Sequence, residues 1–202
     1  MTSPFPPRAP WPDGFPEVIV HGQEKARDAH PCYLAGKSGE SRAAFWLVED
    51  LLYTAENRQQ LQSLKKLCDN FDAVLLPVTA DEAHGYNAIP DALAASLGFE
   101  LGCNIEERGK IVQSNKVSHT RAPGFQRIVT PASFSGQVTE GAQYIIVDDH
   151  TGFGGTIANL RGYVEEGGAH VIGVTTLTAS PNSQKLSVSK HTLNVIYNFY
   201  GT

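Results

Sequence analysis

One stretch of the chain carries most of the structural information: Ile145-Ile-Val-Asp-Asp-His-Thr-Gly-Phe-Gly-Gly-Thr-Ile157. Its apolar start continues from Gln143 and is typical of a buried strand, which we expect over residues 143–147. Two adjacent aspartates follow that strand, and a glycine-rich turn then opens a helix expected from about Gly155 to Glu166. Ligands of open α/β sheets bind beyond the carboxyl ends of the strands. The acids and the turn are therefore expected at a ligand site.

The segments on either side of this stretch alternate between short apolar strands and helices. That alternation favours a parallel sheet, because each parallel connection must cross one face of the sheet. The expected elements are strands at 73–78, 99–103 and 171–177 and a helix at 88–97. The sequence therefore predicts the α/β fold class, a parallel sheet flanked by helices, for a core domain that covers residues 71–202.

Residues 1–70 have a different character, with prolines and scattered aromatic side chains at the start and helical spacing of apolar residues further on. We expect a proline-rich arm at 1–16, a strand at 17–21, a helix at 41–55 and a second helix around Leu61, Leu64 and Leu67. This part is predicted to form an N-terminal arm and helical hood. The tail from 190 to 200 suits either a helix or an edge strand.

Composition excludes several classes of protein. Lys and Arg total 16 against 21 Asp and Glu, a formal net charge of −5, so direct binding of nucleic acid through phosphate contacts is not expected. Cys32, Cys68 and Cys103 are far apart in sequence and are expected to be unpaired core thiols of a reducing compartment. No apolar run approaches the roughly 20 residues of a membrane span. We therefore expect no membrane association and a cytoplasmic location.

The glycine turn excludes two common nucleotide motifs. A dinucleotide fingerprint that began at Gly152 would need glycine where Ile157 stands, and the Gly-Lys-Ser/Thr of a P-loop is absent. Adjacent carboxylates can accept hydrogen bonds from vicinal ribose hydroxyls, while turn amides and a helix N-terminus hold a phosphate. The sequence therefore predicts a ribose 5-phosphate ligand. The alternatives are a helix cap for the acids and a tight strand-to-helix turn for the glycines.

The same residues resemble the signature of the type I phosphoribosyltransferases, in which an apolar strand and two acids precede a small-residue loop ending in Thr-Gly-x-Thr. The matching segment here is Val147-Asp-Asp-His-Thr-Gly-Phe-Gly-Gly-Thr156. Further upstream, Pro77-Val78, His84-Gly-Tyr-Asn87 and Ala92-Leu-Ala-Ala-Ser-Leu-Gly98 are similar to the ComF-like branch of that family. The resemblance covers residues 73–177 and leaves residues 1–70 out.

This resemblance implies an enzyme that transfers the 5-phosphoribosyl group from phosphoribosyl pyrophosphate (PRPP) to a base or another nitrogen acceptor, with Mg²⁺ held mainly by ligand phosphates. The implied catalytic residues, which would also hold the ribose hydroxyls, are Asp148 and Asp149. The implied 5′-phosphate loop consists of Thr151, Gly152, Phe153, Gly154, Gly155 and Thr156. The implied pyrophosphate loop consists of Thr79, Ala80, Asp81 and Glu82, and a mobile lid would lie within 104–126. The resemblance also implies a homodimer.

Three departures from the family pattern leave an alternative open. Phe153 stands where the family has threonine, which removes one hydroxyl donor to the phosphate. Asp81 and Glu82 place negative charge where pyrophosphate would bind, and His84 replaces the expected arginine. Neutralisation would then come from Mg²⁺ or from lid cations, for which the candidates are Arg108, Lys110, Lys116 and Arg121. The alternative is a catalytically weak or inactive protein of the same fold that binds PRPP or a nucleotide and regulates a partner.

Overall fold

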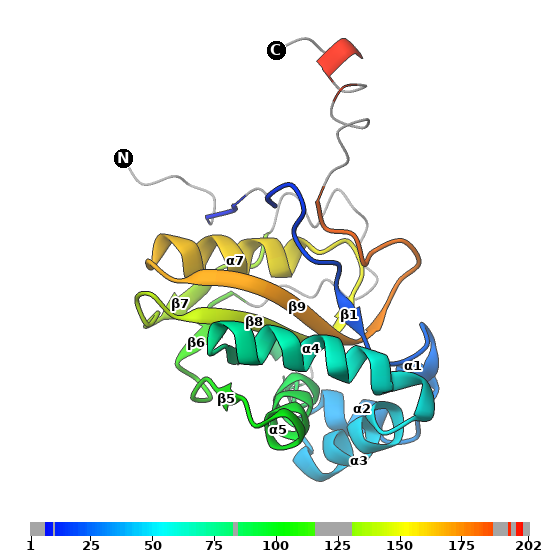
Figure 1. The fold of residues 1–202 in the computed structure, drawn as a ribbon. Coiled ribbons are helices and arrows are strands. Elements are labelled where there is room, and N and C mark those ends of the chain that lie inside the picture. Colours follow the sequence, from blue (N-terminus) through cyan, green and yellow to red (C-terminus); the bar gives the residue numbers. More distant parts are fainter. Residues whose placement is uncertain are drawn as a thin grey trace.

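The computed structural model describes residues 7–9, 11–82, 85–115, 131–187, 194 and 197–199, with the backbone alone at 81–82. A five-stranded sheet forms its centre, in the order β1-β9-β8-β2-β5, and every neighbouring pair is parallel (Figure 1). The strands are β1 (Ile19–Val20), β2 (Val74–Pro77), β5 (Asn104–Ile105), β8 (Gln143–Thr151) and β9 (His170–Ala179). The predicted fold class, a parallel sheet flanked by helices, is confirmed.

Helices cover both faces of this sheet (Figure 1). One face packs against α7 (Gly155–Glu166), and the other packs against α4 (Arg58–Phe71) and α5 (Ile89–Leu101). Successive residues of a strand point to opposite faces, so Ile145 joins the core under α5 while Ile146 joins the core under α7. The continuous apolar run of β8 is therefore buried on both sides.

The N-terminal segment is built into the same molecule. Its strand β1 forms one edge of the central sheet beside β9, and its α3 (Ser41–Leu52) packs beside α5. The predicted helical stripe is confirmed, because Ala44, Leu47 and Val48 are fully buried. The remaining elements are α1 (Ala26–Ala29), α2 (Tyr33–Lys37) and the short helix η1 (Ala55–Asn57). The division at residue 70 stays a prediction.

The boundaries of two predicted strands are wrong. Residues 99–101 belong to α5, which ends at Gly102 with a φ of +70°, a left-handed conformation that suits glycine at a helix end. The strand expected at 99–103 is instead the short β5. β8 does not end at Val147, because pairing with β9 continues to Thr151 opposite Ala179. The two aspartates are therefore strand residues.

The cysteine prediction is wrong for two of the three residues. Cys68, in the last turn of α4, and Cys103, just before β5, form a disulfide, with Cα atoms 6.2 Å apart. A separation of 35 residues in sequence gives no indication of this pairing, which depends on α4 lying close to the start of β5. Cys32 is a free cysteine.

Two small antiparallel ribbons accompany the central sheet. β3 (Asp81–Glu82) pairs with β4 (Gly85–Tyr86), and β6 (Ile111–Gln113) pairs with β7 (Phe134–Gly136). Residues 116–126 of the predicted lid lie outside the described residues, as does most of the tail at 190–200, whereas residues 104–115 include β5 and β6. In the described part of the chain, no helix is both long and apolar enough to cross a membrane.

Candidate functional site

The predicted acids lie together at the carboxyl end of β8. Asp148 and Asp149 are 8% and 5% exposed, and the backbone N–H of Asp149 donates to Asp148 Oδ1 at 2.8 Å. Buried charged groups are costly unless they are paired or hydrogen-bonded. The charge of these two carboxyl groups therefore depends on the groups that pair with them.

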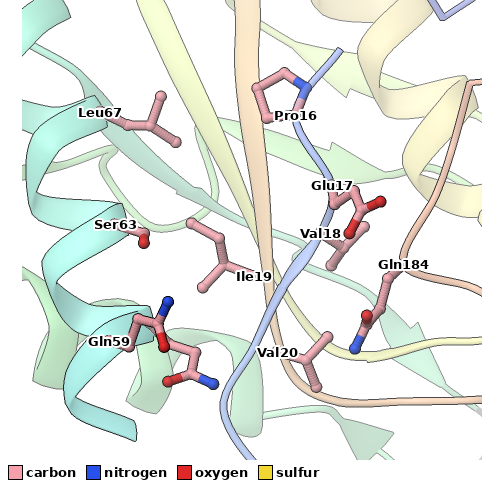
Figure 2. Close-up of a pocket in the computed structure, with 10 residues that line it drawn as sticks. Pro16, Glu17, Val18, Ile19, Val20, Gln59, Ser63, Leu67 and Gln184 are labelled. Atoms are coloured by element: carbon pink, nitrogen blue, oxygen red, sulfur yellow. The ribbon is translucent and has the colours of Figure 1, made fainter. Parts of the chain in front are cut away.

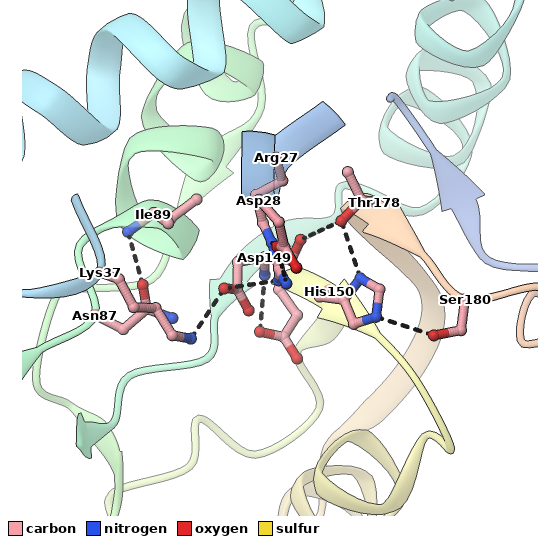
Figure 3. A network of polar contacts seen from close by, with 10 residues as sticks. Arg27, Asp28, Lys37, Asn87, Ile89, Asp149, His150, Thr178 and Ser180 are labelled. Carbon is pink, nitrogen blue, oxygen red and sulfur yellow. Dashed lines mark hydrogen bonds and ion pairs between the residues drawn. The ribbon is translucent and has the colours of Figure 1, made fainter. Parts of the chain in front are cut away.

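Asp149 is paired with two cations from the N-terminal segment (Figure 3). Its Oδ2 accepts hydrogen bonds from Arg27 Nη1 at 3.1 Å and from Lys37 Nζ at 3.0 Å. The side chains of Arg27 and Lys37 are only 8% and 17% exposed. Sequence analysis missed both cations, because they stand more than 100 residues before Asp149 and in a segment without a family motif.

The two neighbouring carboxyl groups have opposite protonation preferences. Burial would raise the pKa of Asp149, but the charges of Lys37 and Arg27 outweigh it and hold that pKa below its usual range. Burial, together with the charge of Asp149, raises the pKa of Asp148 well above its usual range. The protonated form is thus favoured at Asp148 and the ionised form at Asp149. Arg27 also pairs with Asp28, so two cations and two carboxylates meet at this end of β8.

The glycine turn presents an open helix N-terminus next to these acids. Gly154 precedes the first turn of α7 with a φ of +68°, and a Cβ on Gly155 would meet nothing within 4 Å. Thr151 is 1% exposed, and its hydroxyl has no hydrogen-bond partner among the described residues. Because the first amides of a helix lack intrahelical partners, this turn can hold a phosphate. Phe153 is 79% exposed at the turn.

His150 contacts two hydroxyl groups from the end of β9 and the residues beyond it (Figure 3). Its Nδ1 lies 2.9 Å from Thr178 Oγ1, and its Nε2 lies 3.1 Å from Ser180 Oγ. Thr178 Oγ1 also donates to the carbonyl of Asp149, so it is free to accept from a protonated Nδ1. Burial and the nearby Arg27 lower the pKa of His150. These contacts favour a neutral ring that carries its proton on Nδ1.

The implied pyrophosphate loop begins at the same edge of the sheet. Thr79 and Ala80 follow β2, the strand beside β8, and both are 9% exposed. The side chains of Asp81 and Glu82, and all of His84, lie outside the described residues.

The predicted lid cations that the structure describes have acidic partners. Arg108 pairs with Asp91 at 3.4 Å and stacks on Tyr86, and Lys110 pairs with Glu106 at 2.9 Å. Lys116 and Arg121 lie outside the described residues. The role predicted for the lid cations, neutralisation of pyrophosphate, stays a prediction, and the cations that the structure places at Asp149 are Arg27 and Lys37.

The hollows in the described part of the molecule include two that are large enough for a small ligand. One, of about 500 Å³, lies between β1 and α4, is lined by residues such as Ile19 and Gln59, and includes neither the aspartates nor the glycine turn (Figure 2). The other, of about 860 Å³, is lined by the glycine turn itself. The second is the hollow relevant to a ligand at the turn.

The described side chains do not form a complete set of protein ligands for a metal ion. Within the described ranges, no group of three or more His, Cys, Asp or Glu side chains is arranged to hold a metal ion. Asp149 is already paired with two cations. These residues fit a Mg²⁺ ion that is held mainly by the phosphates of a ligand, as Mg²⁺ often is in proteins.

Comparison with curated proteins finds long relatives. The chain is 38% identical over 194 residues to Protein TraN of Escherichia coli. The matched segment covers 96% of this chain and 42% of TraN. It is 37% identical over 157 residues to an uncharacterized protein of Haemophilus influenzae. That match covers 78% of this chain and 34% of the relative. The chain thus spans less than half the length of both. No family model matches it.

Similar solved structures are phosphoribosyltransferases. An adenine phosphoribosyltransferase from Thermoanaerobacter pseudethanolicus is 22% identical, with 59% of this chain and 65% of that chain covered and a TM-score of 0.38. A purine phosphoribosyltransferase from Pyrococcus horikoshii is 15% identical, with 63% and 76% covered and a TM-score of 0.39. TM-scores this low do not assign the chain to that family, and membership of the ComF-like branch stays a prediction.

Proposed function

We propose that this chain binds PRPP at the carboxyl ends of β2 and β8 and transfers its phosphoribosyl group to a nitrogen acceptor with release of pyrophosphate. The observation that supports this most directly is the buried pair Asp148 and Asp149, which is followed by a glycine turn at the start of α7 with open space beside Gly155. A ribose 5-phosphate carries the two features that such a site recognises, a vicinal diol and a phosphate.

In this proposal each part of the site acts on one part of the ligand. The amides of residues 152–156 hold the 5′-phosphate, and the carboxyl groups of Asp148 and Asp149 bind the ribose hydroxyls. The nitrogen lone pair forms a bond to C1 while the bond from C1 to the pyrophosphate oxygen breaks, and the electron pair leaves with pyrophosphate. The ionised Asp149 also stabilises positive charge that develops on the ribose.

The departing pyrophosphate needs positive charge nearby. Mg²⁺, bound through the ligand phosphates, supplies part of that charge when PRPP is present. Arg27 and Lys37 lie beside Asp149, but the carboxylates of Asp149 and Asp28 pair with them, so in this proposal the charge that balances pyrophosphate comes mainly from Mg²⁺. A homodimer, a cytoplasmic location and the lack of direct nucleic-acid binding stay predictions.

A second function, regulation of a partner by a bound PRPP or nucleotide without turnover, is favoured by two features of the site. Asp149 is already engaged by Arg27 and Lys37, so ribose hydroxyls must compete with two buried ion pairs. The missing threonine hydroxyl at Phe153 weakens the phosphate loop by about 1–3 kcal/mol if nothing replaces it. Both features favour slow or absent catalysis over rapid turnover.

Calorimetric titration of PRPP with Mg²⁺ into the folded protein tests the binding site. We expect saturable binding by the wild type and at least tenfold weaker binding by Gly155→Glu. A glutamate in the first turn favours the helix but repels a phosphate, and the open space at this position leaves room for its side chain. Gly155→Gln controls for size, and Asp148→Asn tests the ribose contacts. Absence of binding by the folded wild type, or equal binding by Gly155→Glu, would contradict the site.

Pyrophosphate release then separates the two functions. Release that saturates with an added acceptor supports the transferase. Binding of PRPP without release, across a broad panel of nitrogen bases, supports the regulatory function instead.

A further inference from the structure

One oxygen of Asp149 carries both ion pairs with the N-terminal segment. Its Oδ2 accepts a hydrogen bond from Arg27 Nη1 at 3.1 Å and another from Lys37 Nζ at 3.0 Å (Figure 3). A carboxylate oxygen has about two lone-pair positions that accept hydrogen bonds, so these two donors fill Oδ2. Asp149 is also only 5% exposed. A ribose hydroxyl can therefore donate to this oxygen only after one of the two cations has left it.

Arg27 is held by other groups besides Asp149. Its Nη2 pairs with Asp28 at 2.7 Å, and its guanidinium lies 4.9 Å from the centre of the Tyr33 ring. A guanidinium has five donors in a fixed plane, so it can keep several partners at once. We therefore expect Arg27 to stay in place when a ligand reaches Asp149.

Lys37 has an anchored backbone and a long side chain. It is the last residue of α2, and a Cβ on the preceding Gly36 would lie 3.0 Å from Cα of Ala44, so α2 lies directly against α3. Beyond α2, a Cβ on Gly39 would lie 3.2 Å from the carbonyl oxygen of Tyr86 in β4. A lysine ammonium sits on a flexible four-carbon stem. Lys37 can therefore leave Asp149 by rotation of its side chain while α2 stays packed.

We infer that Lys37 is an autoinhibitory latch, a side chain that blocks the ribose end of the site because its ammonium group occupies the Asp149 oxygen that a ribose hydroxyl would use. The inference rests on the proposed function. Binding of a ribose 5-phosphate displaces Lys37 from Oδ2, and a hydroxyl of the vicinal diol takes its place. A phosphate alone binds at the glycine turn and leaves the latch closed. The latch therefore weakens binding of the sugar, and loss of the latch strengthens it.

Lys37→Met tests the latch by calorimetric titration of ribose 5-phosphate. The variant lacks the ammonium group but keeps an apolar stem, and Asp149 retains its pair with Arg27. We expect at least tenfold higher affinity than in the wild type, because the sugar no longer displaces an ion pair. Inorganic phosphate should bind the variant no more tightly than the wild type. Equal or weaker binding of ribose 5-phosphate by the variant overturns the inference.

Lys65→Met is the matched control. It also removes one lysine and breaks an ion pair with an aspartate, but the pair between Lys65 and Asp69 lies on α4 with side chains that are 50% and 58% exposed. Affinity for ribose 5-phosphate should stay at the wild-type value. A gain as large as that of Lys37→Met would mean that net charge alone sets the affinity, which overturns the latch.

Acetylation of lysine amines, followed by mass spectrometry, tests the wild type directly and does not depend on the folding of a variant. The Lys37 side chain is 17% exposed and ion-paired, so we expect slow acetylation without ligand. Saturating ribose 5-phosphate should make Lys37 react several-fold faster, because the sugar displaces its ammonium group from Asp149. Lys65 is the internal reference and should react at an unchanged rate. An unchanged or slower reaction of Lys37 overturns the inference.

Titration of PRPP with Mg²⁺ into the same proteins separates the latch from the proposed function. PRPP binding by the wild type, with equal affinities of wild type and Lys37→Met for ribose 5-phosphate, overturns the latch and leaves the proposed function standing. No binding of either ligand by either folded protein overturns the proposed function and the latch with it. PRPP binding together with the gain in Lys37→Met supports both.

Discussion

At the scale of single residues, the site depends most on the carboxylate of Asp149, which compensates two buried cations. Asp149→Asn keeps the shape of the side chain but removes its charge. We expect a loss of about 3 kcal/mol in the free energy of unfolding, because Lys37 and Arg27 lose the buried carboxylate that they share, although Arg27 keeps its pair with the more exposed Asp28. Urea unfolding at pH 7 measures this.

A matched control is Asp69→Asn, which breaks the ion pair between Lys65 and Asp69, whose side chain is 58% exposed. An exposed pair contributes at most about 1 kcal/mol. Equal losses in the two variants would show that the contacts of Arg27 and Lys37 with Asp149 contribute no more than a surface pair.

His150 gives a second prediction at this scale. Burial and the charge of Arg27 lower its pKa, and Thr178 accepts from Nδ1. We expect a neutral ring with its proton on Nδ1 at pH 7 and a pKa below the ordinary value of about 6.5. Long-range ¹H–¹⁵N spectra over a pH series report both properties, with His150→Gln to assign the signal. A ring protonated on Nε2 at pH 7 would contradict a hydrogen bond from Nδ1 to Thr178.

The residues of the candidate site differ in how far sequence alone could predict them. Asp148, Asp149 and the glycine turn are contiguous in sequence. Because they directly follow a strand, the sequence alone predicts that they lie together at one edge of the sheet. Arg27 and Lys37 reach Asp149 only through the packing of α1 and α2 beside the sheet. No local pattern marks such long-range partners. The hollow also depends on long-range packing, because its lining comes from both ends of the chain.

At the scale of elements, His21 joins three parts of the fold just after β1. Its ring nitrogens contact Asn57 of η1 at 3.1 Å and Thr175 of β9 at 2.7 Å. Burial lowers the pKa of His21 to about 4, although the bond with Asn57 opposes that shift. The folded protein therefore favours the neutral ring, whereas the unfolded chain takes up the proton at about pH 6.5.

Because the unfolded chain binds a proton at His21 more readily than the folded protein does, stability falls as the pH falls. The contribution of His21 to stability is fully present above about pH 6.5 and is lost as the pH falls towards 4, by about 3 kcal/mol in total. The unfolding free energy of the wild type should therefore fall more steeply over this range than that of His21→Gln. Urea unfolding at several pH values measures the difference. Identical slopes would show that His21 takes up its proton equally in the folded and unfolded states.

Sequence predicts the helices and strands well where the spacing of apolar residues is regular. It predicts the residues at which they end less well. The apolar runs of β8 and β9 and the helical stripe of α3 are confirmed because each periodicity matches its burial. The α5 boundary was wrong because Phe99 and Leu101 are as suitable for a strand as for a helix. The left-handed Gly102 ends that helix, and a glycine in sequence does not reveal its φ.

At the scale of the whole molecule, the N-terminal segment and the core share one hydrophobic cluster. Leu47 of α3 and Leu64 of α4 are fully buried in the same cluster as Leu97 of α5 and Ile145 of β8. The segment also supplies β1 to the central sheet and Arg27 and Lys37 to the site. Loss of this packing would therefore disturb both stability and ligand binding, so we expect the chain to unfold as one cooperative unit.

Leu64→Ala, in a Trp11→Phe background, tests that cooperativity. Trp46 of α3 is then the only tryptophan and reports on the N-terminal segment, while far-ultraviolet circular dichroism reports on the whole fold. We expect a loss of about 2–5 kcal/mol from the deleted core contacts, with the two signals still changing at the same urea concentration. Leu34→Ala, at a side chain that is 75% exposed, should change stability by less than about 0.5 kcal/mol. Earlier unfolding at Trp46 would mean that the N-terminal segment separates from the sheet on its own, so Arg27 and Lys37 could leave Asp149 without global unfolding.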